Sequence, residues 1–223
     1  MLLAIDTSTA WISLALYEGS LVHFENTWKS QHHHTVELAP AIHDLFKRTG
    51  TQPSDLTGVA VALGPGSFTS LRIGLAAAKG LVFSLKIPLI GIPSLDVVAA
   101  AQPLDDKPLI AVLSAGRTRL AYATYRVQDN QWQPVDNPAV IDPKELVKTI
   151  HEPTLIVGEL SEESRAIIGR RWKNAILVSP AQSLRRASHL AEIAWQRLVD
   201  DQIDDPVHLS PIYLSTSNNP IPA

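Results

Sequence analysis

The first residues that could do chemistry are Asp6-Thr7-Ser8-Thr9, which directly follow a short apolar run. Hydroxyl and backbone N–H groups at a turn between strands can hold a phosphate, and a carboxylate beside them can orient a metal-bound water. The spacing alone leaves two interpretations open. The four residues are either a weak, vestigial phosphate-binding turn or a polar hairpin turn.

A two-domain phosphoryl-transfer enzyme would also need a second phosphate turn and an adenosine site. The stretch "SAGRTR", which begins at Ser114, has no carboxylate at the place that corresponds to Asp6. After the apolar run that ends at Gly158, Glu159 and Leu160 put charge and bulk where a nucleotide needs close approach of the backbone. Two of the three nucleotide elements are degraded. We therefore predict no catalytic residue and no cofactor held by this chain alone.

Metal and nucleophile sites are also disfavoured. The chain has no cysteine, and His32, His33 and His34 are adjacent, with His43 nine residues further on. Adjacent side chains point in different directions, whereas paired metal ligands on a helix lie one turn apart, so we predict no metal site. The loop "GPGSFT" around Ser67 lacks the second glycine of a nucleophile elbow and the Gly-Lys of a P-loop. A tight turn and a weak anion site at a helix N-terminus remain alternatives there.

Composition restricts the class of protein. The chain has 223 residues and a formal net charge of −3. This charge is unfavourable for a protein that would bind the phosphate backbone of a nucleic acid without a partner. The basic pairs at 170–171 and 185–186 are interpreted as solvated helix ends. The N-terminus lacks the basic region of a signal peptide, and the apolar region 73–85 is broken by Lys79 and too short to span a bilayer. We expect a cytoplasmic protein with no membrane segment.

The first hundred residues give a clear order of elements. Buried strands are expected at 2–6, 12–17 and 21–27, followed by a helix at 35–48, an apolar strand at 58–63, a loop and helix up to 85, a strand at 88–92 and a helix from Ser94. Three leading strands followed by crossovers form a ribonuclease-H-like layout.

A similar order returns after the Pro- and Asp-rich segment 101–108. The expected elements are strands at 109–113, 119–126 and 132–135, a helix starting at Asp142, a strand at 154–157, a helix starting at Ser161, a strand at 175–178 and a helix at 188–199. We predict an α/β fold of two ribonuclease-H-like domains, 1–103 and 109–203, with mixed sheets flanked by helices. Residues 204–223 are expected to form a mobile C-terminal tail.

The helix after Ser67 is apolar nearly all round. One face, sufficient to cover a sheet, carries Leu71, Leu75, Ala78 and Val82. A neighbouring stripe of small or apolar side chains carries Gly74, Ala77 and Leu81 beside Ile73. Such a stripe lets another helix approach closely, and exposed apolar patches usually mark contact sites. Either the second domain or a separate partner covers it, and we favour a partner. The predicted interface residues are Leu71, Ile73, Gly74, Ala77, Ala78 and Leu81.

Four segments in order resemble the TsaB (YeaZ) family: "AIDTSTAWISLALYEG", "HTVELAPAIHDLF", "GVAVALGPGSFTSLRIGLAAAKGL" and "GIPSLDVVA". The second half is similar mainly through "GRTRLAYATY" and "LIVGE". Ser114, Leu160 and Ser215 stand where the family usually carries Asp, Gly and Arg. The resemblance therefore does not extend to nucleotide or partner contacts at these three positions.

The resemblance implies an ASKHA-type fold and a non-catalytic subunit of the machinery that adds threonylcarbamoyl to the adenosine beside the tRNA anticodon. It also implies pairing of the apolar helix with the catalytic paralogue TsaD, or with a second copy in isolation, and recruitment of the ATPase TsaE. ATP or ADP would bind only at the interface of the complex, and tRNA only through the complex. TsaD holds a metal through paired histidines that this chain lacks. An active small-molecule kinase of the same fold is the alternative function.

Overall fold

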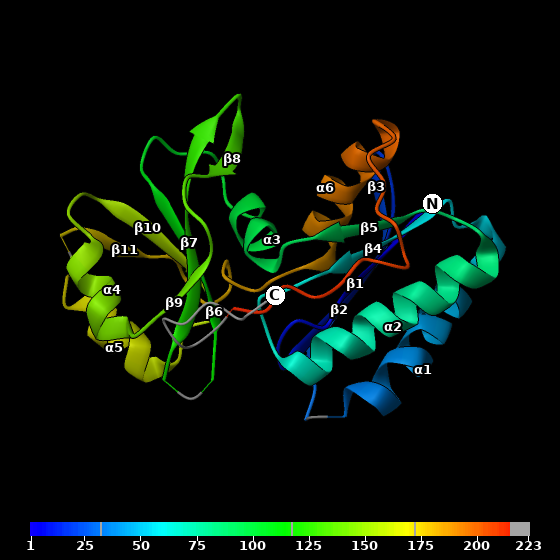
Figure 1. Cartoon of the computed structure of the whole chain (residues 1–223), viewed down its shortest axis with the longest axis horizontal. Helices are drawn as coiled ribbons and strands as arrows, with labels where there is room; N and C mark the ends of the chain where they lie inside the picture. The colour runs from blue at the N-terminus through cyan, green and yellow to red at the C-terminus, as the bar shows by residue number, and fades with distance from the viewer. Residues whose placement is uncertain (32, 117, 172, 215–223) are drawn as a thin grey trace. The chain divides into compact units, whose positions relative to one another are not determined.

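The computed structural model describes residues 1–31, 33–116, 118–171 and 173–214. These residues form two compact units (Figure 1). Unit 1 contains residues 1–97 and 186–212, and unit 2 contains residues 98–185 with 213–214.

Unit 1 is built on a five-stranded mixed sheet in the order β3-β2-β1-β4-β5. The first three strands form an antiparallel meander, and β4 and β5 run parallel to β1. This order confirms the ribonuclease-H-like layout that the sequence predicts. The elements of this unit, with the short helix α3 that leads out of it, are β1 (Leu2–Asp6), β2 (Trp11–Glu18), β3 (Leu21–Lys29), α1 (His34–Thr49), η1 (Pro53–Asp55), β4 (Gly58–Ala62), α2 (Phe68–Leu85), β5 (Leu89–Ile92), α3 (Ser94–Ala100) and α6 (Ala187–Val199).

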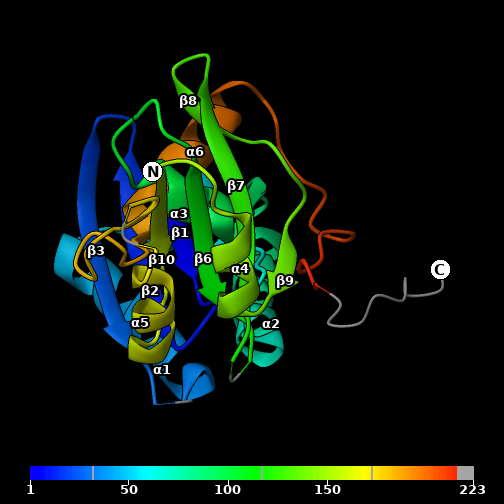
Figure 2. The same cartoon turned by 90° about the vertical axis from the view of Figure 1, so that its left-hand side faces the viewer.

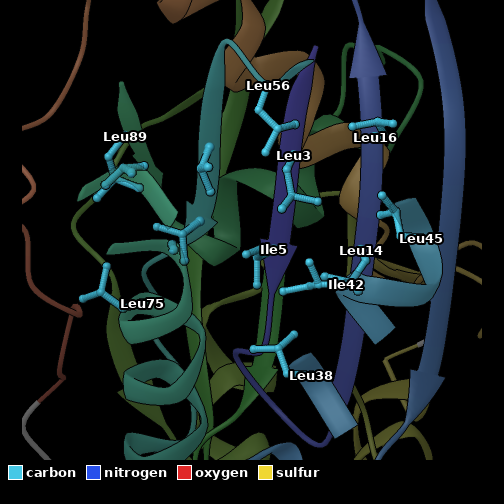
Figure 3. Close-up of a cluster of buried hydrophobic side chains, with 14 of the residues drawn as sticks. Leu3, Ile5, Leu14, Leu16, Leu38, Ile42, Leu45, Leu56, Leu75 and Leu89 are labelled. Carbon is cyan, nitrogen blue, oxygen red and sulfur yellow. The ribbon is translucent and has the colours of Figure 1, made fainter. Parts of the chain in front are cut away.

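Strands β1, β2, β4 and β5 are buried on both faces, because α1 and α2 cover one face of the sheet and α6 covers the other (Figure 1). The edge strand β3 is largely exposed. Alternate residues of β1 point to opposite faces. Leu3 and Ile5 pack toward α1 and α2 (Figure 3), whereas Leu2 and Ala4 pack toward α6. This explains why β1 reads as a continuous apolar run instead of an alternating one.

Unit 2 repeats the sheet order as β11-β10-β6-β7-β8. Strands β6, β7 and β8 are antiparallel, and β10 and β11 run parallel to β6. Helices α4 and α5 cover one face through a shared apolar cluster (Figure 2). The elements are β6 (Leu109–Ser114), β7 (Leu120–Gln128), β8 (Gln131–Pro134), β9 (Ala139–Ile141), α4 (Pro143–Thr149), β10 (Thr154–Gly158), α5 (Glu162–Gly169) and β11 (Ala175–Leu177). Strand β9, which pairs with β7, was not anticipated from the sequence.

The predicted extent of the C-terminal domain, 109–203, is wrong at its end. Helix α6 belongs to unit 1, where its buried alanines pack against Ala4, Ala60 and Ala62 of the first sheet. Small side chains on both surfaces allow helix and sheet to approach closely. The apolar stripe of this helix indicated that it covers a sheet, but it carried no information about which sheet.

The segment after α6 is also not a free tail as far as residue 212. Asp204 pairs with Leu89 of the edge strand β5, and its carboxylate accepts a hydrogen bond of 2.8 Å from the N–H of Gly91. Ile212 donates its N–H to the carbonyl of Leu63 at 2.8 Å and packs against the core. The tail prediction for residues 215–223 lies outside the described residues.

Within the part of the chain that the structure describes, α2 is the one helix long and apolar enough to cross a membrane by length and composition. Its inner face contributes Leu71, Leu75, Ala78 and Val82 to the buried interior of unit 1. In this structure α2 therefore serves as a core helix whose outer face is largely, but not wholly, apolar.

Candidate functional site: the Asp6–Thr9 turn and helix α2

The turn formed by Asp6, Thr7, Ser8 and Thr9 connects β1 to β2 and is buried, with no residue more than 6% exposed. The carboxylate of Asp6 accepts the N–H of Ser8 through Oδ1 at 2.8 Å. An Asp that bonds the backbone two residues on stabilises a local turn. Asp6 therefore has a structural role here that its sequence position alone did not distinguish from a catalytic one.

The loop 64–67 packs directly on this turn. The N–H of Ser67 donates to the carbonyl of Ser8 at 2.7 Å. A Cβ on Gly66 would lie 2.0 Å from the same carbonyl oxygen, so the backbones can approach this closely only with glycine there. The glycine-containing loop is thus explained by contact between two backbone segments.

Hydroxyl groups of the turn have partners within the chain. Ser8 Oγ shares a hydrogen bond of 2.6 Å with Ser94 Oγ, which also accepts the N–H of Gly64 at 3.0 Å. Thr7 donates Oγ1–H to the carbonyl of Ser70 in α2 at 2.7 Å. A phosphate held by these hydroxyls would have to compete with those bonds. Nucleotide binding at the turn stays a prediction.

Two of the neighbouring histidines lie at the beginning of α1, where His33 is the N-cap and His34 is the first helical residue. His34 is 4% exposed, and its Nε2–H donates to the carbonyl of Thr9 at 2.9 Å. Glu37 accepts the indole N–H of Trp28 at 2.7 Å, and this bond, with a second from Ser30, holds its pKa below the ordinary value. His32 lies outside the described residues. Among those that are described, no three His, Asp or Glu side chains gather into a group that could hold a metal ion.

The predicted interface residues divide into two groups. Leu71, Gly74 and Ala78 face the interior of unit 1, so the prediction that they form a partner surface is wrong. The exposed stripe of the helix runs through residues 72, 76 and 80, each one position before the predicted 73, 77 and 81. The other three, Ile73, Ala77 and Leu81, are partly exposed and pack along the edge of the core. Their contact with a partner stays a prediction.

The exposed face of α2 carries a different set of residues that the sequence reasoning missed. Phe68 and Phe83 are 53% and 55% exposed, and Arg72, Ala76 and Gly80 are exposed between them. The guanidinium of Arg72 lies 3.8 Å from the centroid of the Phe68 ring. The sequence contained a signal for this face, because residues four apart, such as 68, 72, 76 and 80, lie along one stripe of a helix. We call these five residues the outer face of α2.

In unit 2, the residues that depart from a nucleotide-binding pattern contact other residues of the chain. Glu159 forms an ion pair of 2.8 Å with Arg185, whose side chain is 1% exposed. The interpretation of Arg185 as a solvated helix end is therefore wrong. Leu160 packs against an apolar cluster, and Ser114 Oγ donates to the carbonyl of Gly116 at 3.2 Å. Ser215 lies outside the described residues.

Comparisons with known proteins agree with this arrangement. The family model described as TsaD, tRNA N6-adenosine threonylcarbamoyltransferase, matches residues 28–199. The tRNA threonylcarbamoyladenosine biosynthesis protein TsaB of Bacillus subtilis is 31% identical over 204 residues, covering 90% of this chain and 89% of that protein. The protein of the same name from Escherichia coli is 29% identical and covers 96% of this chain and 94% of its own length.

Among solved structures, YeaZ from Pseudomonas aeruginosa matches with a TM-score of 0.79 at 22% identity, covering 96% of this chain and 99% of that one. The likeness concerns the fold, which with its two mixed sheets is of the ASKHA type. Fold, sequence identity and coverage agree, and the chain therefore belongs to the TsaB (YeaZ) family and, with it, to the wider family that the TsaD model describes.

Proposed function

We propose that this chain is a non-catalytic subunit in the biosynthesis of threonylcarbamoyladenosine in tRNA, and that it pairs with a TsaD-like catalytic paralogue through the outer face of α2. The names of the curated relatives supply the process. The observation that carries the proposed pairing is the outer face itself: two half-exposed phenylalanines flank Ala76 and Gly80 on one helix.

The shape of this face suits a second helix. A Cβ on Gly80 would meet no atom within 4 Å in this chain, so the surface there is open. Helices that meet over small residues approach to about 8 Å, and the flanking aromatic rings can then pack beside the partner. Helix α2 carries Arg72 and Lys79 and no acidic residue, which favours a partner surface with acidic groups around an apolar centre.

The alternative, an active small-molecule kinase, is less well supported. The hydroxyls of Thr7 and Ser8 are engaged inside the chain, and Glu159 lies in an ion pair where an adenosine site would need open backbone. Magnesium-dependent ATP binding by the chain alone would favour the kinase. We place nucleotide binding at the interface of the complex and tRNA binding in the complex as a whole.

In isolation the same face joins two copies of this chain, and the complex recruits a TsaE-like ATPase in the cytoplasm. The chain alone transfers no threonylcarbamoyl group in this proposal, and activity appears only when the TsaD-like paralogue is present.

The proposed pairing is tested by Ala76→Glu, with Ala166→Glu as the matched control. Both alanines are exposed on helices, Ala76 on α2 and Ala166 on α5. Burial of an unpaired carboxylate at an interface costs several kcal/mol, so we expect Ala76→Glu to weaken binding to the paralogue by about a hundredfold or more. Exposed substitutions change stability by at most about 0.5 kcal/mol, so both variants should melt like the wild type.

Calorimetric titration with the purified paralogue, sedimentation of the chain alone and tRNA modification by the mixture measure these effects. Ala166→Glu should behave as the wild type in all three. If Ala76→Glu binds and activates the paralogue normally, the outer face of α2 is not the interface. Modification of tRNA by the wild-type chain alone would contradict a non-catalytic role.

A further inference from the structure

The turn at residues 6–9 contacts the inner face of α2 through a buried threonine. Thr7 is 1% exposed, and its hydroxyl donates to the carbonyl of Ser70 at 2.7 Å. In an α-helix this carbonyl also pairs with the N–H four residues on, that of Gly74. The hydroxyl of Thr7 therefore adds a second bond to a carbonyl that already belongs to the helix.

Gly74 makes this contact close. A Cβ there would lie 2.2 Å from Thr7 Oγ1 and 3.3 Å from Thr7 Cβ. The hydroxyl thus occupies the space that the missing Cβ leaves. Any side chain at position 74 would push the helix away from the turn, so Thr7 and Gly74 together set the distance between α2 and the sheet.

The next residue of the turn holds the beginning of the same helix. The carbonyl of Ser8 accepts the N–H of Ser67 at 2.7 Å. Ser67 is the N-cap of α2, and its hydroxyl accepts the N–H of Ser70. Thr7 and Ser8 therefore fix α2 at two successive points, its N-cap and its first turn.

We propose that the turn at residues 6–9 positions the outer face of α2 for partner binding, and that Thr7 is the positioning residue. This inference rests on the proposed function. Ser70 lies between Phe68 and Arg72 in sequence, and two residues along a helix correspond to a rotation of about 200°. Phe68 and Arg72 consequently project on the side opposite the contact with Thr7, and a rotation or shift at Ser70 moves both of them.

The hydroxyl is tested with Thr7→Val and Thr7→Ser. Valine keeps the shape and removes the donor, whereas serine keeps the donor. We expect Thr7→Val to weaken binding of the TsaD-like paralogue from the same organism by about threefold to tenfold, and to speed amide exchange in the first turns of α2. Thr7→Ser should bind within about twofold of the wild type.

Thr154→Val is the matched control. Thr154 is 4% exposed in unit 2 and donates Oγ1–H to the carbonyl of Glu152 at 2.9 Å. Its loss should lower the melting temperature about as much as Thr7→Val does and leave the affinity for the paralogue unchanged. If Thr7→Val also binds with the wild-type dissociation constant, the turn is merely structural and the inference is overturned.

A second pair of variants keeps the test decisive if Thr7→Val does not fold. Gly74→Ala should weaken binding, because its Cβ meets the Thr7 hydroxyl. Thr7→Ala combined with Gly74→Ala removes that clash and should recover part of the affinity. The absence of any recovery would overturn the inference. Ala76→Glu separates the two proposals, because normal binding by that variant contradicts the proposed function itself.

Discussion

At the scale of single residues, the carboxylate of Asp6 is buried and has a structural role in the turn. It is 0% exposed and closes the turn by accepting the N–H of Ser8. A phosphate-binding carboxylate in a nucleotide site would instead need room for a metal-bound water. In this chain the side chain determines backbone conformation at the point where α2 is held.

We predict that Asp6→Ala destabilises the chain by about 1–3 kcal/mol, because the buried N–H of Ser8 loses its acceptor. Asp6→Asn keeps an oxygen at the same place and should be closer to the wild type. Thermal and denaturant unfolding measure both. Activity of the reconstituted complex distinguishes the roles: a loss of a hundredfold or more in Asp6→Asn, with assembly intact, would identify Asp6 as a catalytic group.

At the scale of elements, α6 begins without a capping side chain of its own. Its first N–H groups are satisfied from the sheet, where Ser13 Oγ accepts from Ala187 at 2.8 Å and Glu25 accepts from Ser188 at 2.9 Å. Arg186 also binds the Glu25 carboxylate. Glu25 thus joins β3 to the start of a helix that lies more than 160 residues later in the sequence.

The charge of Glu25 should make part of the stability depend on pH. Burial raises the pKa of Glu25, but hydrogen bonds from Ser188 and Arg186 outweigh it and hold the pKa below the ordinary 4.5. A lowered pKa in the folded state means that the contribution is fully present above about pH 4.5 and is lost as the pH falls through the folded value. His189, on the same helix, has a pKa lowered by burial.

We predict that Glu25→Gln lowers the free energy of unfolding at pH 7 by up to about 2 kcal/mol, the upper range for a partly buried charge at a helix terminus. The difference from the wild type should shrink below pH 4.5. Urea unfolding between pH 3 and pH 7 measures it. Glu192→Gln, an exposed position on the same helix, is the control and should change little at any pH. A constant difference across this range would show that the carboxylate charge is not involved.

At the scale of the whole molecule, the chain leaves unit 1 after residue 97 and returns to it at residue 186. Along the sequence, the second unit therefore separates α6 from the strands of the sheet that α6 covers. Leu190 and three alanines of α6 are fully buried against that sheet. Each large apolar side chain left exposed to water lowers the free energy of unfolding by about 1.5–3 kcal/mol. Burial of one face of the sheet, and with it the stability of unit 1, therefore depends on α6 near the end of the chain.

We predict that a fragment of residues 1–103 does not form a cooperatively folded domain, although the sequence alone suggested this boundary. Residues 1–97 joined by a flexible linker to 186–212 should unfold cooperatively, because α6 and the segment along β5 are restored. Chemical-shift dispersion and thermal melting distinguish the two fragments. A stable, well-dispersed 1–103 fragment would contradict the role assigned to α6.

Apart from strand β9 and the short helix η1, the sequence by itself determined the order of elements, the two mixed sheets and the apolar character of α2 on nearly all sides. These depend on patterns within consecutive residues: the continuous apolar run of β1, the cap at Asp142 and glycines at tight turns. It also carried the likeness to the TsaB family. Each of these signals is local, so an unaligned chain is sufficient to show it.

Only the tertiary structure decided which surfaces meet. Gly74 reads as part of an open small-residue stripe until Thr7, more than sixty residues away, is found against it. Arg185 reads as a solvated charge until Glu159 is found beside it, and α6 reads as part of the second domain until its alanines meet β1 and β4. A side chain's own type sets what it can contact, but burial depends on residues far away in sequence, and a local pattern does not contain them.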